Sequence, residues 1–187
     1  MVEIKGEVIN GSINAVKKRN GVQVYNDIIS QLDEQTRQFY EKPISVTGWY
    51  LYDFLIKFLE AEIKLTATGD ENELQRRSEE LFEKQLKGIY KIFFELGSPE
   101  VVFDHFSTLI MAYFKGVLVK VKFDGPDKAI ITYTGFEKQH RLVQPSLLGF
   151  LKKVLEISGV KDIHAKHLTL IEKGKGYLEF ELTWKGK

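Results

Sequence analysis

Three features are missing from this chain of 187 residues, and each absence excludes a class of function. With 0 Cys there is no disulfide, thiol nucleophile or thiolate metal ligand, which fits a reducing compartment, so we expect a cytoplasmic protein. The 27 Lys and Arg nearly balance 26 Asp and Glu, and a formal net charge of +1 argues against a nucleic-acid-binding protein. No run of about 18 uncharged apolar residues occurs, so no membrane insertion is expected. No signal peptide is expected either, since Glu3, Lys5 and Glu7 interrupt the first residues.

The motifs of common catalytic and nucleotide-binding sites are also absent. The sequence contains no GxGxxG, no GxxxxGK followed by Ser or Thr, and no GxSxG. His164 and His167 lie three residues apart in an expected strand and therefore point to opposite faces, which prevents them from chelating one metal ion. Asp104, His105 and Ser107 are near neighbours on an expected helix and point apart, so they do not form a triad. We predict no catalytic residues and no metal ligands.

The segment from Trp49 to Leu65 predicts the helix around which the core is built. Wound at about 100° per residue, its apolar side chains cover some two-thirds of the circumference, whereas a surface helix needs a face of only about 100°. Ser45 and Thr47 are expected to cap its N-terminus. Glu62 is the one charge outside a narrow polar stripe. That stripe consists of Asp53, Lys57, Glu60 and Lys64.

Other segments before residue 116 predict a mainly helical half. Asp33 is a plausible N-cap, Asn20-Gly21 ends one helix, and Ser98-Pro99 starts another. The expected elements are a short strand over 2–9 and helices over 13–20, 22–32, 33–42, 71–96 and 99–115.

After Gly116 the apolar period changes from 3.6 to 2, which predicts strands. Strands are expected over 117–123, 128–136, 160–172 and 176–184, with a helix from Pro145 to residue 158 between the two hairpins. This order predicts a four-stranded antiparallel sheet (β-β-α-β-β) covered on one face by helices. The predicted fold class is therefore α+β, in one domain over 1–187.

Aromatic side chains gather on three successive helices of the first half. They predict either a large solid core or a slot between helices and sheet, lined by rings and open to a small apolar ligand. The candidate ligand-binding residues are Trp49, Tyr52, Phe54, Phe58, Tyr90, Phe93, Phe106 and Tyr113. Two helices have apolar arcs too wide for one neighbour, which also predicts a homodimer.

Three segments, 4–21, 109–125 and 147–184, resemble the heme nitric-oxide/oxygen-binding (H-NOX) superfamily. That group includes vinyl-reductase-like domains, vesicle-tethering TRAPP subunits and bacterial relatives of about this length. The resemblance implies an N-terminal helical half packed on the four-stranded sheet. It points to a bacterial relative that lacks heme and metal ligands.

Two departures set this chain apart from the heme-binding members. Those members hold the heme propionates with a Tyr-x-Ser-x-Arg motif, whereas here Tyr133 is followed by Thr134, Gly135, Phe136 and Glu137. Their proximal histidine corresponds to Ser107, two residues from His105. We therefore expect no heme and no other cofactor.

Two functions follow from the resemblance and the aromatic residues. The first is a non-enzymatic ligand-sensing or protein-interaction module that binds a small apolar ligand between helices and sheet. The alternative is a vinyl-reductase-type enzyme acting on a hydrophobic substrate, and a titrating residue in an internal pocket would favour it.

Overall fold

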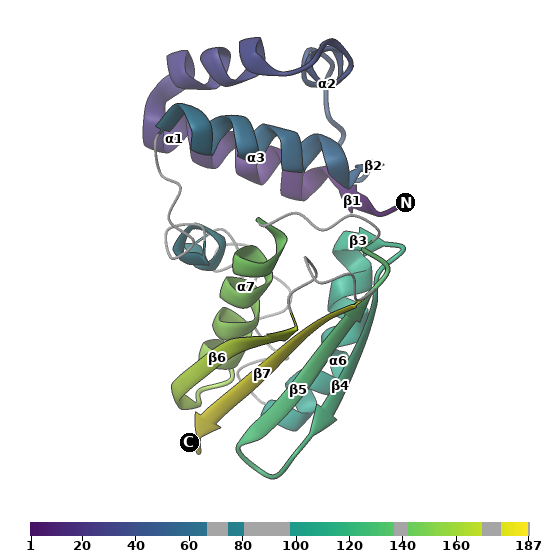
Figure 1. The fold of residues 1–187 in the computed structure, drawn as a ribbon, viewed down its shortest axis with the longest axis vertical. Coiled ribbons are helices and arrows are strands. Elements are labelled where there is room, and N and C mark those ends of the chain that lie inside the picture. Colours follow the sequence, from purple (N-terminus) through teal and green to yellow (C-terminus); the bar gives the residue numbers. More distant parts are fainter. Residues whose placement is uncertain (67–74, 81–97, 137–141, 170–176, 187) are drawn as a thin grey trace.

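The helices of residues 6–66 lie together at one end of the molecule, whereas the later helix over 99–113, predicted as part of the same half, lies against the sheet (Figure 1). The computed structural model describes residues 1–66, 75–80, 98–136, 142–169 and 177–186. Helix α1 (Gly6–Gln31) lies beside α3 (Tyr52–Thr66), and the short α2 (Glu34–Tyr40) joins them. Strand β1 (Glu3–Lys5) is shorter than predicted, because its last residues instead begin α1.

Two predicted helix boundaries in this half are confirmed. Gly21 has φ 88° and ψ 165°, and this residue interrupts α1 with a kink between the two predicted helices. A positive φ is readily adopted only by glycine, which explains the Asn-Gly signal. The Asp33 carboxylate caps α2 by accepting a hydrogen bond from the Thr36 amide at 3.0 Å.

The predicted start of the central helix is wrong. Trp49–Leu51 form strand β2, and α3 begins only at Tyr52, whose amide donates to the Val2 carbonyl at 3.0 Å. A short apolar run fits both periods, and here the edge of β1 offers backbone partners that favour a strand. Ser45 and Thr47 therefore do not cap the helix; they lie before β2, with their hydroxyl oxygens 3.2 Å apart.

The second half is the predicted four-stranded antiparallel sheet. Helix α6 (Pro99–Tyr113) leads into β3 (Phe114–Lys115), which pairs with β1. The sheet order is β4-β5-β7-β6, from β4 (Leu118–Phe123), β5 (Lys128–Thr134), β6 (Lys161–Thr169) and β7 (Tyr177–Lys185). Helix α7 (Val143–Ile157) starts two residues before the predicted Pro145. Ser98 is the N-cap of α6, although its side chain makes no capping hydrogen bond.

Helices α6 and α7 pack on the inner face of this sheet. The ring centroid of Phe106 on α6 lies 5.6 Å from that of Phe150 on α7 and 6.4 Å from that of Tyr133 on β5. All three side chains are buried, and they belong to a hydrophobic cluster that reaches Ile4 and Val8 in the first half. This cluster joins the two halves across the junction between them.

Part of the prediction falls outside the described residues. Only residues 75–80 of the predicted helix 71–96 are described, and these are helical. The predicted turn between β6 and β7 is likewise outside them. Among the helices that the structure describes, none is long and apolar enough to cross a membrane.

Candidate functional site

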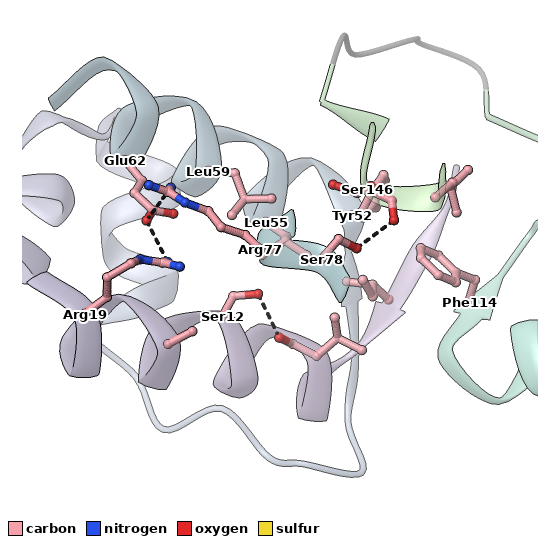
Figure 2. Close-up of a pocket in the computed structure, with 14 residues that line it drawn as sticks. Ser12, Arg19, Tyr52, Leu55, Leu59, Glu62, Arg77, Ser78, Phe114 and Ser146 are labelled. Atoms are coloured by element: carbon pink, nitrogen blue, oxygen red, sulfur yellow. Dashed lines mark hydrogen bonds and ion pairs between the residues drawn. The ribbon is translucent and has the colours of Figure 1, made fainter. Parts of the chain in front are cut away.

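A cavity of about 90 Å³ lies at the junction between the two halves, and we call it the junction cavity (Figure 2). One wall comes from the first half, where side chains repeat at helical spacing so that they share a face of each helix. From α1 these are Val8, Ser12, Ala15 and Arg19; from α3 they are Tyr52, Leu55, Leu59 and Glu62. Ile4 of β1 extends this wall.

The opposite wall comes from later parts of the chain. It is formed by Arg77 and Ser78 of the helical segment 75–80, Phe114 of β3, and Ser146 and Leu147 of α7. The lining is mainly apolar, with its charged groups gathered at one end (Figure 2). A concave, mainly apolar surface with a few polar groups is the usual character of a small-molecule site.

The charged end is an ion cluster around Glu62. This side chain is 3% exposed, and its Oε1 accepts hydrogen bonds from Arg19 Nη2 at 3.1 Å and from Arg77 Nη1 at 3.0 Å. The side chain of Arg77 is only 11% exposed, and that of Arg19 is 30% exposed. Two guanidiniums compensate the buried carboxylate, and the cluster ties segment 75–80 to both α1 and α3.

Segment 75–80 also approaches α7 closely. The Ser78 hydroxyl donates to the Ser146 carbonyl at 2.6 Å. Gly149 of α7 faces the carbonyl of Gln75, and a Cβ at Gly149 would collide with that oxygen. The missing side chain therefore allows this helical segment to pack against α7 and close one side of the cavity.

The other end of the cavity is aromatic. Tyr52 lies with its ring centroid 5.5 Å from that of Phe114, at an interplanar angle of 78°. Phe136 adds a third ring, 5.8 Å from Tyr52. Burial raises the pKa of Tyr52 well above its ordinary value, which keeps the hydroxyl neutral.

The candidate ligand-binding residues are dispersed, and only Tyr52 of the described ones lines the junction cavity. Trp49 lies on β2 with the Lys115 ammonium 4.4 Å from its ring centroid. Phe54 stacks on Phe39 at 4.4 Å between centroids. Phe58, Phe106 and Tyr113 are buried in the hydrophobic cluster. Tyr90 and Phe93 lie outside the described residues. A ligand at any of these positions stays a prediction.

Sequence reasoning missed the ion cluster, although it noted one sign of it. Glu62 is the only charge off the polar stripe of the central helix, and the structure turns this side chain inward. Its partners come from distant positions, Arg19 and Arg77, and no local pattern connects them. The one sequence feature that could have indicated the cluster was a charged residue on the apolar face of a predicted helix.

The described lining offers little for catalysis or for a metal ion. The one carboxylate, that of Glu62, is already engaged by two guanidiniums. No group of three or more His, Asp or Glu side chains that could hold a metal occurs in the described part of the chain. His105 and His164 have exposed side chains on α6 and β6, and neither lines the cavity.

Comparison with known proteins finds similarity in structure alone. No protein-family model matches the chain, and no curated protein matches its sequence. An Fe(II) unliganded H-NOX protein from K. algicida is similar with a TM-score of 0.73 and 13% identity, covering 98% of each chain. An S. oneidensis H-NOX protein in the Fe(II)NO ligation state has a TM-score of 0.71 and 12% identity, covering 98% of this chain and 100% of the other.

A Tt H-NOX protein is also similar, with a TM-score of 0.68 and 12% identity over 98% of this chain and 96% of that one. The predicted H-NOX-like α+β fold, with N-terminal helices and a four-stranded antiparallel sheet, is thus confirmed. At 12–13% identity these similarities establish the fold alone.

The described residues do not fit the heme that this fold implies. The described lining of the junction cavity has no His, Cys or Met, and its one tyrosine, Tyr52, has a raised pKa, which opposes ligation as tyrosinate. Tyr133, the retained residue of the propionate motif, is fully buried between the rings of Phe106 and Phe180.

Proposed function

We propose that this chain is a non-enzymatic, sensor-type ligand-binding domain that takes a small, mainly apolar molecule in the junction cavity. The observation that carries this proposal is the position of the cavity between α1 and α3 on one side and segment 75–80 and α7 on the other. A molecule bound in the cavity contacts both walls, so it stabilises the conformation in which the two walls lie close together. A ligand shifts a conformational equilibrium by its differential affinity for the two states, and this position provides that difference.

The H-NOX-like fold supports a sensor role, because the similar chains include H-NOX proteins in Fe(II) and Fe(II)NO states. The lack of heme ligands in the described lining supports a different occupant. At about 10–30 Å³ for each water-sized group, the cavity accepts roughly three to nine non-hydrogen atoms. We expect a ligand of that size rather than a large cofactor.

Saturation-transfer NMR on the full chain tests the proposal with a panel of small apolar and amphipathic molecules. Ala15 lines the cavity, so Ala15→Leu fills part of it; Ala112 is also half-buried but lies on α6 outside the cavity lining, so Ala112→Leu is the matched control. We expect a signal for at least one small molecule with the wild type and with Ala112→Leu, and its loss with Ala15→Leu. A panel without any binder, or equal binding by all three proteins, would reject the proposal.

The vinyl-reductase-type alternative has less support. Two side chains of the lining meet its criterion of a titrating residue, Glu62 and Tyr52, but the Glu62 carboxylate is bonded to two guanidiniums and is not placed as a general acid for a substrate. The interaction-module alternative calls for a filled core and a contiguous apolar patch outside, whereas the proposal here is carried by a concave site between the two halves. Homodimer formation and a cytoplasmic location stay predictions.

A further inference from the structure

The four-stranded sheet that the structure describes ends in two edge strands, and they differ in regularity. Strand β6 forms one edge, where its register against β7 shifts twice and Asp162 has a positive φ of 49°. Such irregularities blunt an edge against pairing with further strands. Strand β4 forms the other edge (Figure 1), and its residues Leu118–Phe123 pair with β5 without a shift. Of the two edges, the β4 edge is therefore the regular template for another strand.

The backbone of β4 directs a row of polar groups away from the sheet along this edge. The Asp124 amide donates to the Lys128 carbonyl at 3.0 Å, so alternate residues of β4, counted back from Asp124, direct their backbone groups toward β5. The residues between them direct their N–H and C=O groups outward. These residues are Val119, Val121 and Phe123, and the outward groups bond no other described residue. An added strand would satisfy them.

The same three residues form an apolar row on the inner face of the sheet. Their side chains are half-buried and pack against the hydrophobic cluster, and the Phe123 ring centroid lies 5.8 Å from that of Phe103 on α6. Residues directly opposite each other on neighbouring strands share a face of the sheet. An apolar side chain opposite Val121 would therefore bury surface that this row still exposes.

The outer face of β4 carries two lysines that have no acidic neighbour across the strand. Lys120 and Lys122 are exposed, lie opposite Thr132 and Ile130 of β5, and form no ion pair with any described residue. Leu118, the third member of this row, is 65% exposed. Pairing with a second copy of β4 is disfavoured, because any register that keeps both apolar rows on the inner face places lysines beside lysines.

The interior of the sheet shows the pairing that fits these lysines. On the same outer face, the Glu181 carboxylate of β7 lies between two lysines of its neighbouring strands. Its Oε2 is 3.1 Å from Lys128 Nζ on β5, and its Oε1 is 2.6 Å from Lys166 Nζ on β6. Cross-strand pairs of opposite charge stabilise neighbouring strands. By the same rule, acidic side chains on a fifth strand would complement Lys120 and Lys122.

We propose that β4 is a docking edge for an extended segment of another protein in which apolar and acidic residues alternate. The segment adds a fifth antiparallel strand, with its acidic side chains opposite Lys120 and Lys122 and its apolar side chains over the inner row. This inference goes beyond the proposed function, because it assigns a partner surface whose residues do not line the junction cavity and which needs no ligand there.

Fluorescence anisotropy of labelled peptides tests the charge requirement. The first peptide has the core Val-Glu-Val-Glu-Val between two Ser residues; the second has Gln and the third has Lys in place of each Glu. Exposed ion pairs are weak, so two of them should make the Glu peptide bind about 2- to 30-fold more tightly than the Gln peptide at low salt, and the Lys peptide should bind most weakly.

Charge reversal on the protein provides the matched variants. In the double variant Lys120→Glu, Lys122→Glu, the Lys peptide should bind more tightly than the Glu peptide. The double variant Lys18→Glu, Lys42→Glu changes the net charge equally at exposed positions outside the sheet, and it should keep the wild-type order. All four substituted side chains are exposed, so we expect both variants to fold.

Hydrogen exchange of the backbone amides tests whether the peptide binds as a strand. When nine-tenths of the protein is bound, the Glu peptide should slow exchange at Val119, Val121 and Phe123 by about 10-fold, because exchange then occurs from the free tenth. The same peptide N-methylated at its central Val lacks the amide that would donate to the Val121 carbonyl, and it should give no such protection.

Several results would overturn the inference and leave the proposed function of the cavity untouched. These are no binding of the Glu peptide at millimolar concentration, equal binding of the Glu and Gln peptides, an unchanged order in Lys120→Glu, Lys122→Glu, and protection of β6 amides in place of β4 amides. Protection of the β4 amides that rises with protein concentration without peptide would identify a second copy as the partner and would also overturn it.

Discussion

Replacing Glu62 by Gln tests whether the ion cluster holds the two walls of the junction cavity together. The substitution keeps the size of the side chain and one oxygen acceptor but removes the negative charge. In the wild type the Glu62 carboxylate accepts hydrogen bonds from Arg19 Nη2 at 3.1 Å and from Arg77 Nη1 at 3.0 Å. The variant leaves two guanidiniums facing a neutral amide.

The expected loss follows from burial. Breaking a buried ion pair by removing one partner costs about 3–5 kcal/mol, because the remaining charge stays desolvated. The cost is lower here because Arg19 is 30% exposed and can be hydrated, and because the amide oxygen still accepts a hydrogen bond. We therefore expect Glu62→Gln to lower the free energy of unfolding by about 2–3 kcal/mol.

Urea denaturation measures this loss through the midpoint, with the slope reporting whether the unfolded state has changed. Glu60→Gln, an exposed position on the same helix, is the matched control and should cost at most about 1 kcal/mol, because interactions of exposed charges contribute no more than that. A double-mutant cycle with Arg19→Gln should give a coupling of about 1 kcal/mol. A Glu62→Gln variant as stable as Glu60→Gln would refute the reasoning.

Three further predictions concern other parts of the molecule. Gly6→Ala should lower unfolding stability by about 1–3 kcal/mol in thermal denaturation, because the new Cβ would collide with the Ser45 carbonyl, whereas Gly186→Ala, with open space around it, should not. Hydrogen bonds from the Thr36 side chain and amide lower the pKa of Asp33 to about 2, so its contribution to stability is complete above the unfolded pKa of about 4 and is lost as pH falls toward 2. The gap in melting temperature between wild type and Asp33→Asn should close over that range; a gap independent of pH would contradict this. Hemin added to the purified chain should give no stoichiometric Soret band, and a band abolished by His105→Ala would contradict this prediction.

Local sequence patterns correctly predicted the elements that are determined by interactions between residues close together in the sequence. Alternation from Val117 to Phe123 identified a strand, because one face packs on the core and the other is exposed. Asp33 and Gly21 marked helix ends through interactions within a few residues. Trp49–Leu51 were misassigned because their state depends on a partner strand nearly fifty positions away in the sequence, which the local period does not encode.

The junction cavity could not be predicted in the same way. Its walls come from five separate segments, and a void depends on how closely their side chains pack rather than on residue type. Aromatic enrichment pointed instead to Phe58 and Phe106, which fill the interior. Glu62 was visible as a charge off its stripe, but its arginines became recognisable only in three dimensions.

A crystal structure of the chain grown with saturating butan-1-ol, and a second grown with butyrate, tests the central claim of a ligand-binding junction cavity most directly. The account predicts electron density for the ligand between α1, α3 and α7, in contact with Leu59 and Leu147. Density only at the surface, or a junction filled by the chain's own side chains in both crystals, would contradict it.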